Sequence, residues 1–336
     1  MTARYDFASD NTAPAAPEAM QAVLDANSGF TAGYGADTVT AQAADLIRQL
    51  LDADAEVRFV ASGTAANAIA LAALCKPFES VLAHRHAHAA TDETGAPGFF
   101  GHGLGMIPLP GADGKIDPAA LAAALAQPEN GHVQSPGALS LTNATEYGGV
   151  YSTQALAGLI GTAKDKGAGV HLDGARIFNA AAAGFDLVAI RPLGVDILVI
   201  GGTKAGMPPT EALVIFDRPL AHRFDARLKQ SGQFPSKGRF YAAPFIGMLR
   251  DGAVLRHAAH ANAMAQRLAG QMPFKLNHPV ESSGVFVEMD EPTRLHLQAA
   301  GWMAQRFLDG SVRFMCSWAT TPEAVDELAA ALRQVR

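Results

Sequence analysis

The most constraining feature of the sequence is a repeated alternation, from about residue 40 to 217, of short apolar runs with longer alanine-rich segments. The segments between the runs, such as 64–75 and 153–166, place apolar residues three and four positions apart, as amphipathic helices do. Alternating strands and helices form an α/β domain whose mostly parallel sheet is covered by helices on both faces. Seven runs are predicted to be its strands: 57–61, 80–83, 105–109, 138–143, 169–173, 196–201 and 212–216.

The last part of the chain follows a different pattern. From about residue 237 a long helical stretch leads into "FKLNH", "GVFVEMD", a helix, "SVRFMCSW" and a closing amphipathic helix. No linker rich in Pro, Gly or Ser separates this α+β tail from the α/β part, so we expect the two to pack rigidly, with a site in the cleft between them. We therefore predict a large domain with an N-terminal arm over 1–245 and a small C-terminal α+β domain over 246–336.

Composition excludes several classes of function. The 336 residues are 49% hydrophobic and 17% charged, with a formal net charge of −6 and no Lys/Arg run longer than a pair, so nucleic acid is not an expected partner. The first residues lack the apolar core of a signal peptide, and the longest apolar stretch is interrupted by Asn67, so no membrane segment is expected. The two cysteines, Cys75 and Cys316, suggest neither a disulfide framework nor a metal site, which favours the cytoplasm.

Ligands of parallel sheets bind at the carboxyl ends of the strands, so the residues that follow each strand matter most. Ser62, Gly63 and Thr64 follow the first strand and open a helix. Small residues at this position let backbone N–H groups approach an anion at the positive end of the helix dipole. The same three residues also fit an ordinary helix N-cap without a ligand.

An acid and an arginine follow the fifth strand. Asp173 ends that strand and Arg176 stands three residues later. One interpretation is structural, with the aspartate capping the next helix and pairing with the arginine. The other is functional: Asp173 keeps the ring nitrogen of a cofactor protonated, and Arg176 binds a carboxylate through two parallel hydrogen bonds.

A lone lysine, Lys204, follows the sixth strand in a turn flanked by glycines. The turn joins two apolar runs, which makes full exposure of the lysine unexpected. A lysine partly removed from water can form a Schiff base with a carbonyl compound. An anion cradle, an acid for a ring nitrogen and a Schiff-base lysine at one edge of a sheet together indicate pyridoxal 5'-phosphate.

Motifs ordered along essentially the whole chain then indicate a family. They are "FASDN", "YGAD", "SGTAAN", "HRHAHAATDETGAP", "LTNATEYGGVY", "HLDGARIFNA", "GGTK" and "VRFMCSW". With them the chain resembles the L-threonine aldolases, especially the low-specificity and phenylserine aldolase branch. These are pyridoxal-phosphate enzymes of fold type I, which is the aspartate aminotransferase-like fold.

The resemblance implies roles for the residues around the cofactor. Lys204 would bind it as a Schiff base, Asp173 would face the pyridine nitrogen and His88 would stack on the ring. Gly63 and Thr64 would contact the phosphate, and the basic stretch 223–239 would help to neutralise it through Arg227, Lys229 or Lys237. The complete predicted cofactor-binding set is Ser62, Gly63, Thr64, His88, Asp173, Arg176, Thr203 and Lys204.

The resemblance also implies how the substrate is held. Ser9, Arg176 and Arg313 would bind its carboxylate, and Tyr34 would reach the site from a neighbouring subunit of a homodimer or homotetramer with shared active sites. His132 matches a family histidine placed near the substrate side chain. The predicted catalytic residues are Lys204, His88, His132, Asp173 and Asp92.

Three histidines, His84, His86 and His88, alternate as metal ligands on a strand do. They stand at the start of a helical segment with no cysteine nearby, so no metal is expected. His84 and His86 are therefore expected to be structural.

The predicted reaction is cleavage of an L-β-hydroxy-α-amino acid, such as L-threonine, L-allo-threonine or phenylserine, to glycine and an aldehyde. The proton of the β-hydroxyl would be removed by His88, His132 or a water that they hold. Asp92, four residues after His88 on a predicted helix, would polarise that histidine or meet the hydroxyl. Two alternatives stay open: β-elimination or transamination on the same fold, and a non-catalytic pyridoxal-phosphate carrier.

Overall fold

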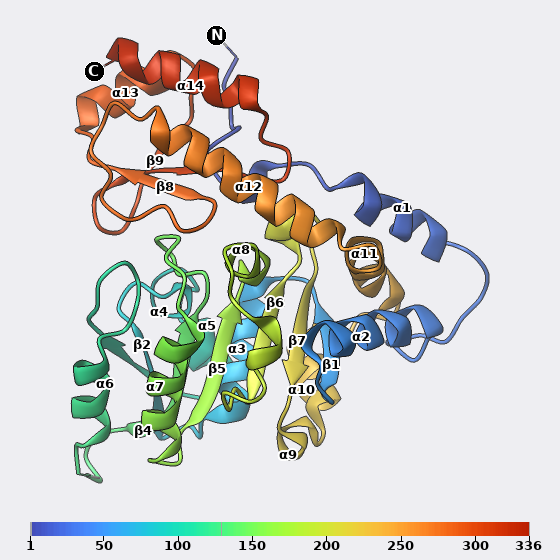
Figure 1. Ribbon diagram of the computed structural model, residues 1–336. Coiled ribbons are helices and arrows are strands. Elements are labelled where there is room, and N and C mark those ends of the chain that lie inside the picture. The colour runs from blue at the N-terminus through green and yellow to red at the C-terminus, as the bar shows by residue number, and fades with distance from the viewer. Residues whose placement is uncertain (1, 129, 336) are drawn as a thin grey trace.

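Two sheets of unequal size organise the chain in the computed structural model, which describes residues 2–128 and 130–335 (Figure 1). The larger sheet has seven strands in the order β1-β7-β6-β5-β4-β2-β3. Neighbours from β3 to β6 run parallel, whereas β7 is antiparallel to both β6 and β1. The prediction of a mostly parallel, seven-stranded α/β fold is confirmed. The strands are β1 (Glu56–Val60), β2 (Glu79–His84), β3 (Gly105–Leu109), β4 (Ser135–Thr142), β5 (Gly169–Gly174), β6 (Ile197–Gly201) and β7 (Glu211–Ile215).

Apolar side chains project from both faces of the large sheet, so helices must cover both faces to exclude water. On β6, Leu198 and Ile200 join the core beneath α2, α7 and α11, while Ile197 and Val199 join the core beneath α3 on the other face. The helices of this part are α1 (Pro17–Ala26), α2 (Thr38–Leu51), α3 (Gly63–Leu74), α4 (His88–Thr91), α5 (Ala96–Phe100), α6 (Pro118–Leu125), α7 (Thr153–Lys164), α8 (Ile177–Ala182), α9 (Arg218–Ala221), α10 (Phe224–Gln230) and α11 (Arg239–Leu249), with short 3-10 helices at Asp10–Thr12, Leu187–Ala189 and Thr203–Ala205.

The smaller sheet is antiparallel, in the order β8-β10-β9, and lies above the large one in Figure 1. The predicted run 274–278 contributes only one bridge, between Leu276 and Val287, and β9 was not predicted. The elements of this part are β8 (Gly284–Val287), β9 (Gln305–Arg306), β10 (Val312–Met315), α12 (Ala253–Gly270), α13 (Glu291–Ala299) and α14 (Pro322–Val335).

Two segments connect the two parts. The long helix α12 places Val254 in the core of the large sheet and Leu268 in the core of the small one. The N-terminal arm also reaches the small sheet, because Phe7 packs in its core and Arg4 bridges to Trp302. The division of the chain at 245/246 stays a prediction, since α12 belongs to both cores.

Among the helices in residues 2–128 and 130–335, none combines the length and the apolar character that crossing a membrane requires.

Candidate active site

Two adjoining cavities lie where the parallel strands end, between the large and the small sheet. The inner chamber, of about 250 Å³, is lined by residues that include Ser62, Asn67, Asp173 and Thr203. The outer chamber, of about 370 Å³, is lined by residues that include Ser9, His86, Asp92, Phe307 and Arg313. Five residues line both chambers: Asn11, His88, Glu146, Arg176 and Lys204. A ligand in one chamber would therefore contact a ligand in the other.

One wall of the inner chamber is the start of α3. Ser62 caps this helix, since its hydroxyl accepts a hydrogen bond from the backbone N–H of Ala65 at 3.3 Å. A side chain at Gly63 would meet no atom within 4 Å, so the space beside this glycine is open. The first N–H groups of a helix have no partner within it, and the dipole makes this end positive. Ser62, Gly63 and Thr64 therefore both cap the helix and offer a place for an anion.

A chain of hydrogen bonds runs behind the inner chamber from Asp173 to His88. Asp173 Oδ1 accepts from Ala175 N and Oδ2 from Asn67 Nδ2, both at 2.9 Å. The Asn67 amide also donates to Glu93 Oε1 at 2.9 Å, and the same oxygen is 2.9 Å from His88 Nδ1. Burial raises the pKa of Glu93, and the bond from Glu93 raises the pKa of His88. The pair therefore holds one proton tightly in the wall of the site.

Lys204 lies in the short 3-10 turn between β6 and β7 and lines both chambers. It forms no ion pair with any residue of 2–128 or 130–335. The glycines around it have a steric cause: a side chain on Gly202 would come within 2.4 Å of Thr210 O, and Gly206 has a φ of +93°. Behind the turn, the buried Glu211 accepts from Gly202 N at 2.7 Å, and burial raises its pKa to about 7.

Arg176 is held by a partner that the sequence did not indicate. Its Nε and Nη2 donate to Asp10 Oδ2 and Oδ1 at 2.6 and 3.0 Å, and both side chains are buried. The structural interpretation that paired Arg176 with Asp173 is therefore wrong, although Asp173 does bond the backbone at Ala175. Burial alone would raise the pKa of Asp10, but the Arg176 guanidinium outweighs it and leaves that pKa lowered. The ion pair fixes one face of the guanidinium and orients the rest toward the chambers.

Arg313 extends from β10 into the outer chamber. Its Nη2 donates to Ala8 O at 3.3 Å, whereas its buried Nε has no hydrogen-bond partner among the described residues. Burial lowers the pKa of Arg313, and the nearby Arg176 lowers it further. A buried N–H of a guanidinium without a partner is costly, so this position suits an anionic group of a ligand. Ser9 lines the same chamber, with its hydroxyl accepting from Asn11 N at 3.2 Å.

The predicted pair of His88 and Asp92 is present, but a second carboxylate is closer. His88 Nε2 lies 3.6 Å from Asp92 Oδ2, and the Asp92 side chain is 83% exposed. Glu93, by contrast, is buried and 2.9 Å from Nδ1 of the same ring. The structure thus places Asp92 at the mouth of the outer chamber and gives the inner side of His88 to Glu93.

His132 is not brought to either chamber, which corrects the expectation that it lies near the substrate side chain. It is exposed, and its backbone N donates to the side chain of Asn130 at 2.9 Å. His132 stands just before β4, and a residue that precedes a parallel strand lies at the edge where the strands begin. That edge is opposite the one that holds Lys204.

Tyr34 and the basic stretch also lie outside both chambers of their own chain. Tyr34 is 48% exposed and packs against Phe234, with ring centroids 5.4 Å apart. The ammonium group of Lys229 lies 4.8 Å from the centre of the Tyr34 ring. Neither Arg227 nor Lys237 lines the inner or the outer chamber.

The neighbouring histidines differ in their surroundings. His84 is buried, with Nε2 3.3 Å from Gly111 O, in agreement with a structural role. His86, which was also expected to be structural, instead lines the outer chamber. The described residues contain no group of three or more potential ligands placed to hold a metal ion.

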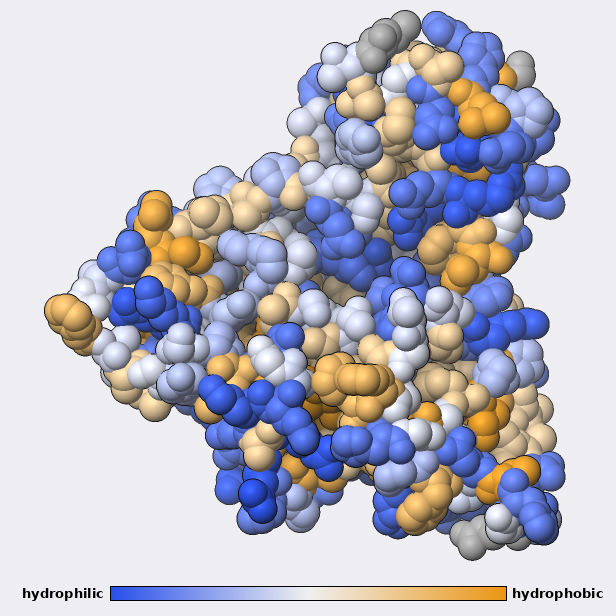
Figure 2. Space-filling view, turned by 180° about the vertical axis from the view of Figure 1, so that it is seen from behind, coloured by the Kyte–Doolittle hydropathy of each residue, from blue (hydrophilic) through white to orange (hydrophobic). Residues whose placement is uncertain are grey.

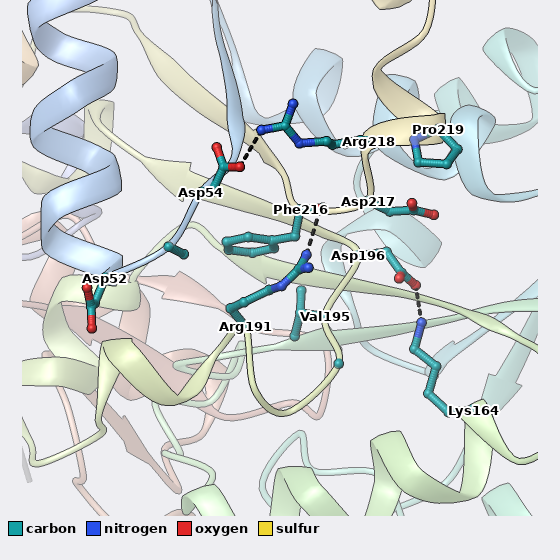
Figure 3. A pocket seen from close by; sticks show the side chains of 12 residues that line it. Asp52, Asp54, Lys164, Arg191, Val195, Asp196, Phe216, Asp217, Arg218 and Pro219 are labelled. Atoms are coloured by element: carbon teal, nitrogen blue, oxygen red, sulfur yellow. Dashed lines mark hydrogen bonds and ion pairs between the residues drawn. The ribbon is translucent and has the colours of Figure 1, made fainter.

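A more voluminous cavity, of about 710 Å³, is a groove at the opposite edge of the large sheet (Figure 3). Each of its three cationic side chains already has a partner: Arg218 pairs with Asp54, Lys164 with Asp196, and Arg191 donates to a backbone carbonyl. We therefore assign the chemistry to the two smaller chambers, which hold the unpaired lysine and the unpartnered guanidinium nitrogen.

The chain is similar to known proteins over nearly its whole length. Residues 6–292 match the model of the β-eliminating lyase family. Low-specificity L-threonine aldolases from a Pseudomonas species and from Pseudomonas aeruginosa are 43% and 45% identical to the chain; each alignment covers 98% of this chain and 97% of the relative. The solved structure of threonine aldolase from Leishmania major is 30% identical, with a TM-score of 0.92 over 99% of this chain and 100% of that one.

Proposed function

The chain belongs to the low-specificity L-threonine aldolases within the β-eliminating lyase family, and we propose that it cleaves L-threonine, L-allo-threonine and related L-β-hydroxy-α-amino acids to glycine and an aldehyde. It is an aldehyde-lyase of fold type I, and its cofactor is pyridoxal 5'-phosphate. One observation carries the proposal: Lys204 lies where an anion cradle with an acid meets a second chamber, in which Arg313 Nε has no hydrogen-bond partner.

The residues of the inner chamber fit the cofactor. The start of α3, with Gly63 and Thr64, would hold the phosphate, and Asp173 would face the ring nitrogen. Lys204 would bind the cofactor covalently, and His88 would stack on its ring. When bound, the cofactor supplies an acceptor for the electron pair of the broken Cα–Cβ bond.

The outer chamber would bind the amino acid. Its carboxylate would take the place that Arg313 Nε leaves without a partner, next to Arg176 and Ser9. A carboxylate held by two guanidinium groups has few orientations left. This clamp would set which bond at Cα is broken, because only one bond at a time can align with the acceptor.

His88 would remove the proton of the β-hydroxyl. The hydrogen bond between Nδ1 and Glu93 leaves the lone pair of a neutral ring on Nε2. That nitrogen is then the acceptor for the proton, either directly or through a water held with Asp92. Because the bond from Glu93 raises the pKa of His88 above the ordinary value of 6.5, the neutral and competent ring forms only above a correspondingly raised pH.

The decisive assay separates the proposal from its alternatives. The purified holoenzyme is incubated with L-threonine, and glycine and acetaldehyde are quantified together with ammonia and 2-oxobutanoate. Glycine and acetaldehyde in equal amounts support the aldolase. Ammonia with 2-oxobutanoate would instead identify a β-eliminating lyase, and the absence of any product, also with an added 2-oxo acid as amino-group acceptor, would leave a non-catalytic carrier.

The assembly belongs to the same proposal: a homodimer or homotetramer in which Tyr34 serves the neighbouring site. Tyr34 and Lys229 form a surface outside their own chambers. The connection between α1 and α2 projects from the molecule, and Figure 2 shows hydrophobic residues at this end, which includes the fully exposed Phe30. Closed symmetric assemblies bury such surfaces. We also propose a cytoplasmic location, with which the free, buried thiols of Cys75 and Cys316 agree.

Co-expression tests the shared site. Tyr34→Ala and Lys204→Ala are each expected to be inactive, but a mixed dimer contains one site with both residues intact. Differently tagged chains allow the mixed dimer to be isolated and assayed. Activity well above that of either parent supports sharing; a mixed dimer without activity would mean that each chain completes its own site.

A further inference from the structure

A second histidine, His86, also lines the outer chamber, and its ring nitrogens have hydrogen-bond roles opposite to those of His88. His86 Nδ1 lies 2.6 Å from Tyr147 Oη. Tyr147 is only 2% exposed, and burial raises the pKa of its phenol, so the phenol keeps its proton. This hydrogen bond therefore joins a neutral phenol to an imidazole at the wall of the chamber.

The tyrosine itself is held firmly. Its ring stacks on His278, with centroids 4.2 Å apart and an angle of 27° between the planes. His278 is clamped in turn by two carboxylates, Asp113 at 2.7 Å and Asp309 at 2.8 Å. Phe286 and Phe307 pack edge-on or tilted against the Tyr147 ring. The phenol oxygen thus has a fixed position from which it orients His86.

The direction of the hydrogen bond follows from the partners available. Within the described parts of the chain, His86 is the only hydrogen-bond partner of Tyr147 Oη. The phenol hydrogen therefore points to Nδ1, and a neutral imidazole that accepts at Nδ1 carries its own hydrogen on Nε2. Burial and the nearby Arg85 lower the pKa of His86, which favours this neutral ring. His86 presents an N–H donor to the outer chamber.

The two histidines complement each other. His88 donates from Nδ1 to Glu93 and offers a lone pair on Nε2, whereas His86 accepts at Nδ1 and offers a hydrogen on Nε2. A hydroxyl group has one hydrogen to donate and lone pairs to accept. A β-hydroxyl between the two rings would satisfy both.

We propose that His86 is a further catalytic residue, whose Nε2–H donates a hydrogen bond to the β-oxygen of the substrate while His88 Nε2 takes its proton. The inference rests on the proposed function. In cleavage, the O–H electron pair becomes the second bond of the aldehyde C=O, the Cα–Cβ pair stays with Cα, and His86 keeps its proton. In the reverse direction the same N–H polarises the aldehyde oxygen. Tyr147 is then a positioning residue that fixes the tautomer of His86.

Two variants of His86 test the role of the donor. His86→Leu removes the N–H and is expected to lower kcat for L-threonine by about 10²-fold, the scale on which loss of one oxyanion donor acts. His86→Gln keeps an N–H donor near the position of Nε2 and is expected to recover most of that loss. If His86→Leu keeps kcat within twofold, or if His86→Gln is as poor as a folded His86→Leu, the inference is overturned.

Binding to the holoenzyme gives a second readout that does not depend on turnover. Glycine lacks a β-oxygen and L-serine has one, so His86→Leu should weaken L-serine at least about fivefold, the effect of roughly one hydrogen bond, and leave glycine within twofold. Equal losses for both ligands would contradict the assignment. The proposed function fails separately, when the wild-type holoenzyme releases no glycine from L-threonine.

The tautomer can be measured directly. In protein labelled with ¹⁵N-histidine, the wild-type His86 signals, assigned by their loss in His86→Gln, should show a protonated Nε2 and an unprotonated Nδ1. Tyr147→Phe should mix the two tautomers and lower kcat without changing the affinity for glycine. A wild-type ring protonated at Nδ1 would overturn the inference.

Discussion

The inner and outer chambers share a lysine but are built in different ways. The inner chamber takes its main groups from residues that directly follow strands of one sheet: Ser62 after β1, Asp173 at the end of β5 and Lys204 after β6. The outer chamber joins the N-terminal arm to the small sheet, where Arg313 reaches the carbonyl of Ala8, 305 positions away in the chain. A cofactor can therefore be held by one sheet, whereas the substrate requires both parts of the molecule.

The two chambers also differ in how completely their polar groups are paired within the protein. The inner groups are fixed by hydrogen bonds between side chains, as in the series from Asp173 through Asn67 to Glu93. The outer chamber keeps the Nε of Arg313 without a partner, so this chamber is completed by its ligand. Substitutions in the inner chamber should therefore stop the chemistry, and those in the outer chamber should weaken binding.

The largest effect is expected at the shared lysine. Lys204→Ala should abolish cleavage and remove the visible absorbance of the bound cofactor while the protein stays folded, because no other described lysine lines either chamber. Circular dichroism and the visible spectrum are the measurements. Lys164→Ala, at the opposite edge of the sheet, is the matched control and should keep both the colour and the activity. An unchanged spectrum in Lys204→Ala would remove the basis of the comparison.

The next effect is expected deeper in the inner chamber. Asp173→Asn keeps the shape but removes the charge that is proposed to face the ring nitrogen, so kcat should fall by about 10²- to 10⁴-fold, the range of a positioned acid. KM for L-threonine should change little, since Asp173 does not line the outer chamber. Steady-state kinetics with saturating cofactor separate the two constants, and a variant that mainly raises KM would contradict the division between the chambers.

In the outer chamber we expect a substitution to change KM more than kcat. Arg313→Ala removes one side of the proposed carboxylate clamp, and hydrogen bonds to a charged group contribute about 1.5 to 3 kcal/mol. KM should therefore rise at least tenfold, since 1.4 kcal/mol corresponds to a factor of ten. Arg267→Ala, which loses only an exposed pair with Asp326, is the control. A KM for L-threonine within twofold of the wild type would show that Arg313 is not part of the clamp.

The smallest effect is a shift in pH dependence at the boundary of the chambers. Glu93 raises the pKa of His88. Since the neutral ring is the proposed base, cleavage should increase as the pH rises through that raised value. In Glu93→Gln the main raising group is gone while the burial of His88 remains, so the low-pH limb of the rate profile should move to lower pH. Asp92→Asn, whose carboxylate is exposed, should move it less. A shift to higher pH would contradict the assignment of His88 as the base.

The same division explains what the sequence could predict. All seven strands of the large sheet were predicted, because buried strands are continuous apolar runs, and with them the inner groups at their ends. Asn67 and Glu93 were missed, since each looks like an ordinary helical or loop residue until the fold brings it to Asp173 or His88. Asp10 was missed because its partner, Arg176, lies 166 positions away.

Outside the inner chamber the sequence was a weaker guide. His132 was expected near the substrate from a matching motif, although it precedes β4 and so lies at the other edge of the sheet. His86 was expected to be structural, because the alternating histidines look alike in the sequence. Only the contact of His86 with Tyr147, 61 positions later, distinguishes it from its neighbours.

Both chambers meet at Lys204, and chemical reduction of the holoenzyme tests whether this lysine serves both. The holoenzyme is reduced with borohydride to make the link between cofactor and lysine permanent, digested, and analysed by mass spectrometry, with and without prior saturation by glycine. We expect one pyridoxyl group per chain on the peptide that contains Lys204. This label should be lost when glycine has displaced the lysine before reduction. A label on any other lysine, or a Lys204 label that glycine does not diminish, would contradict it.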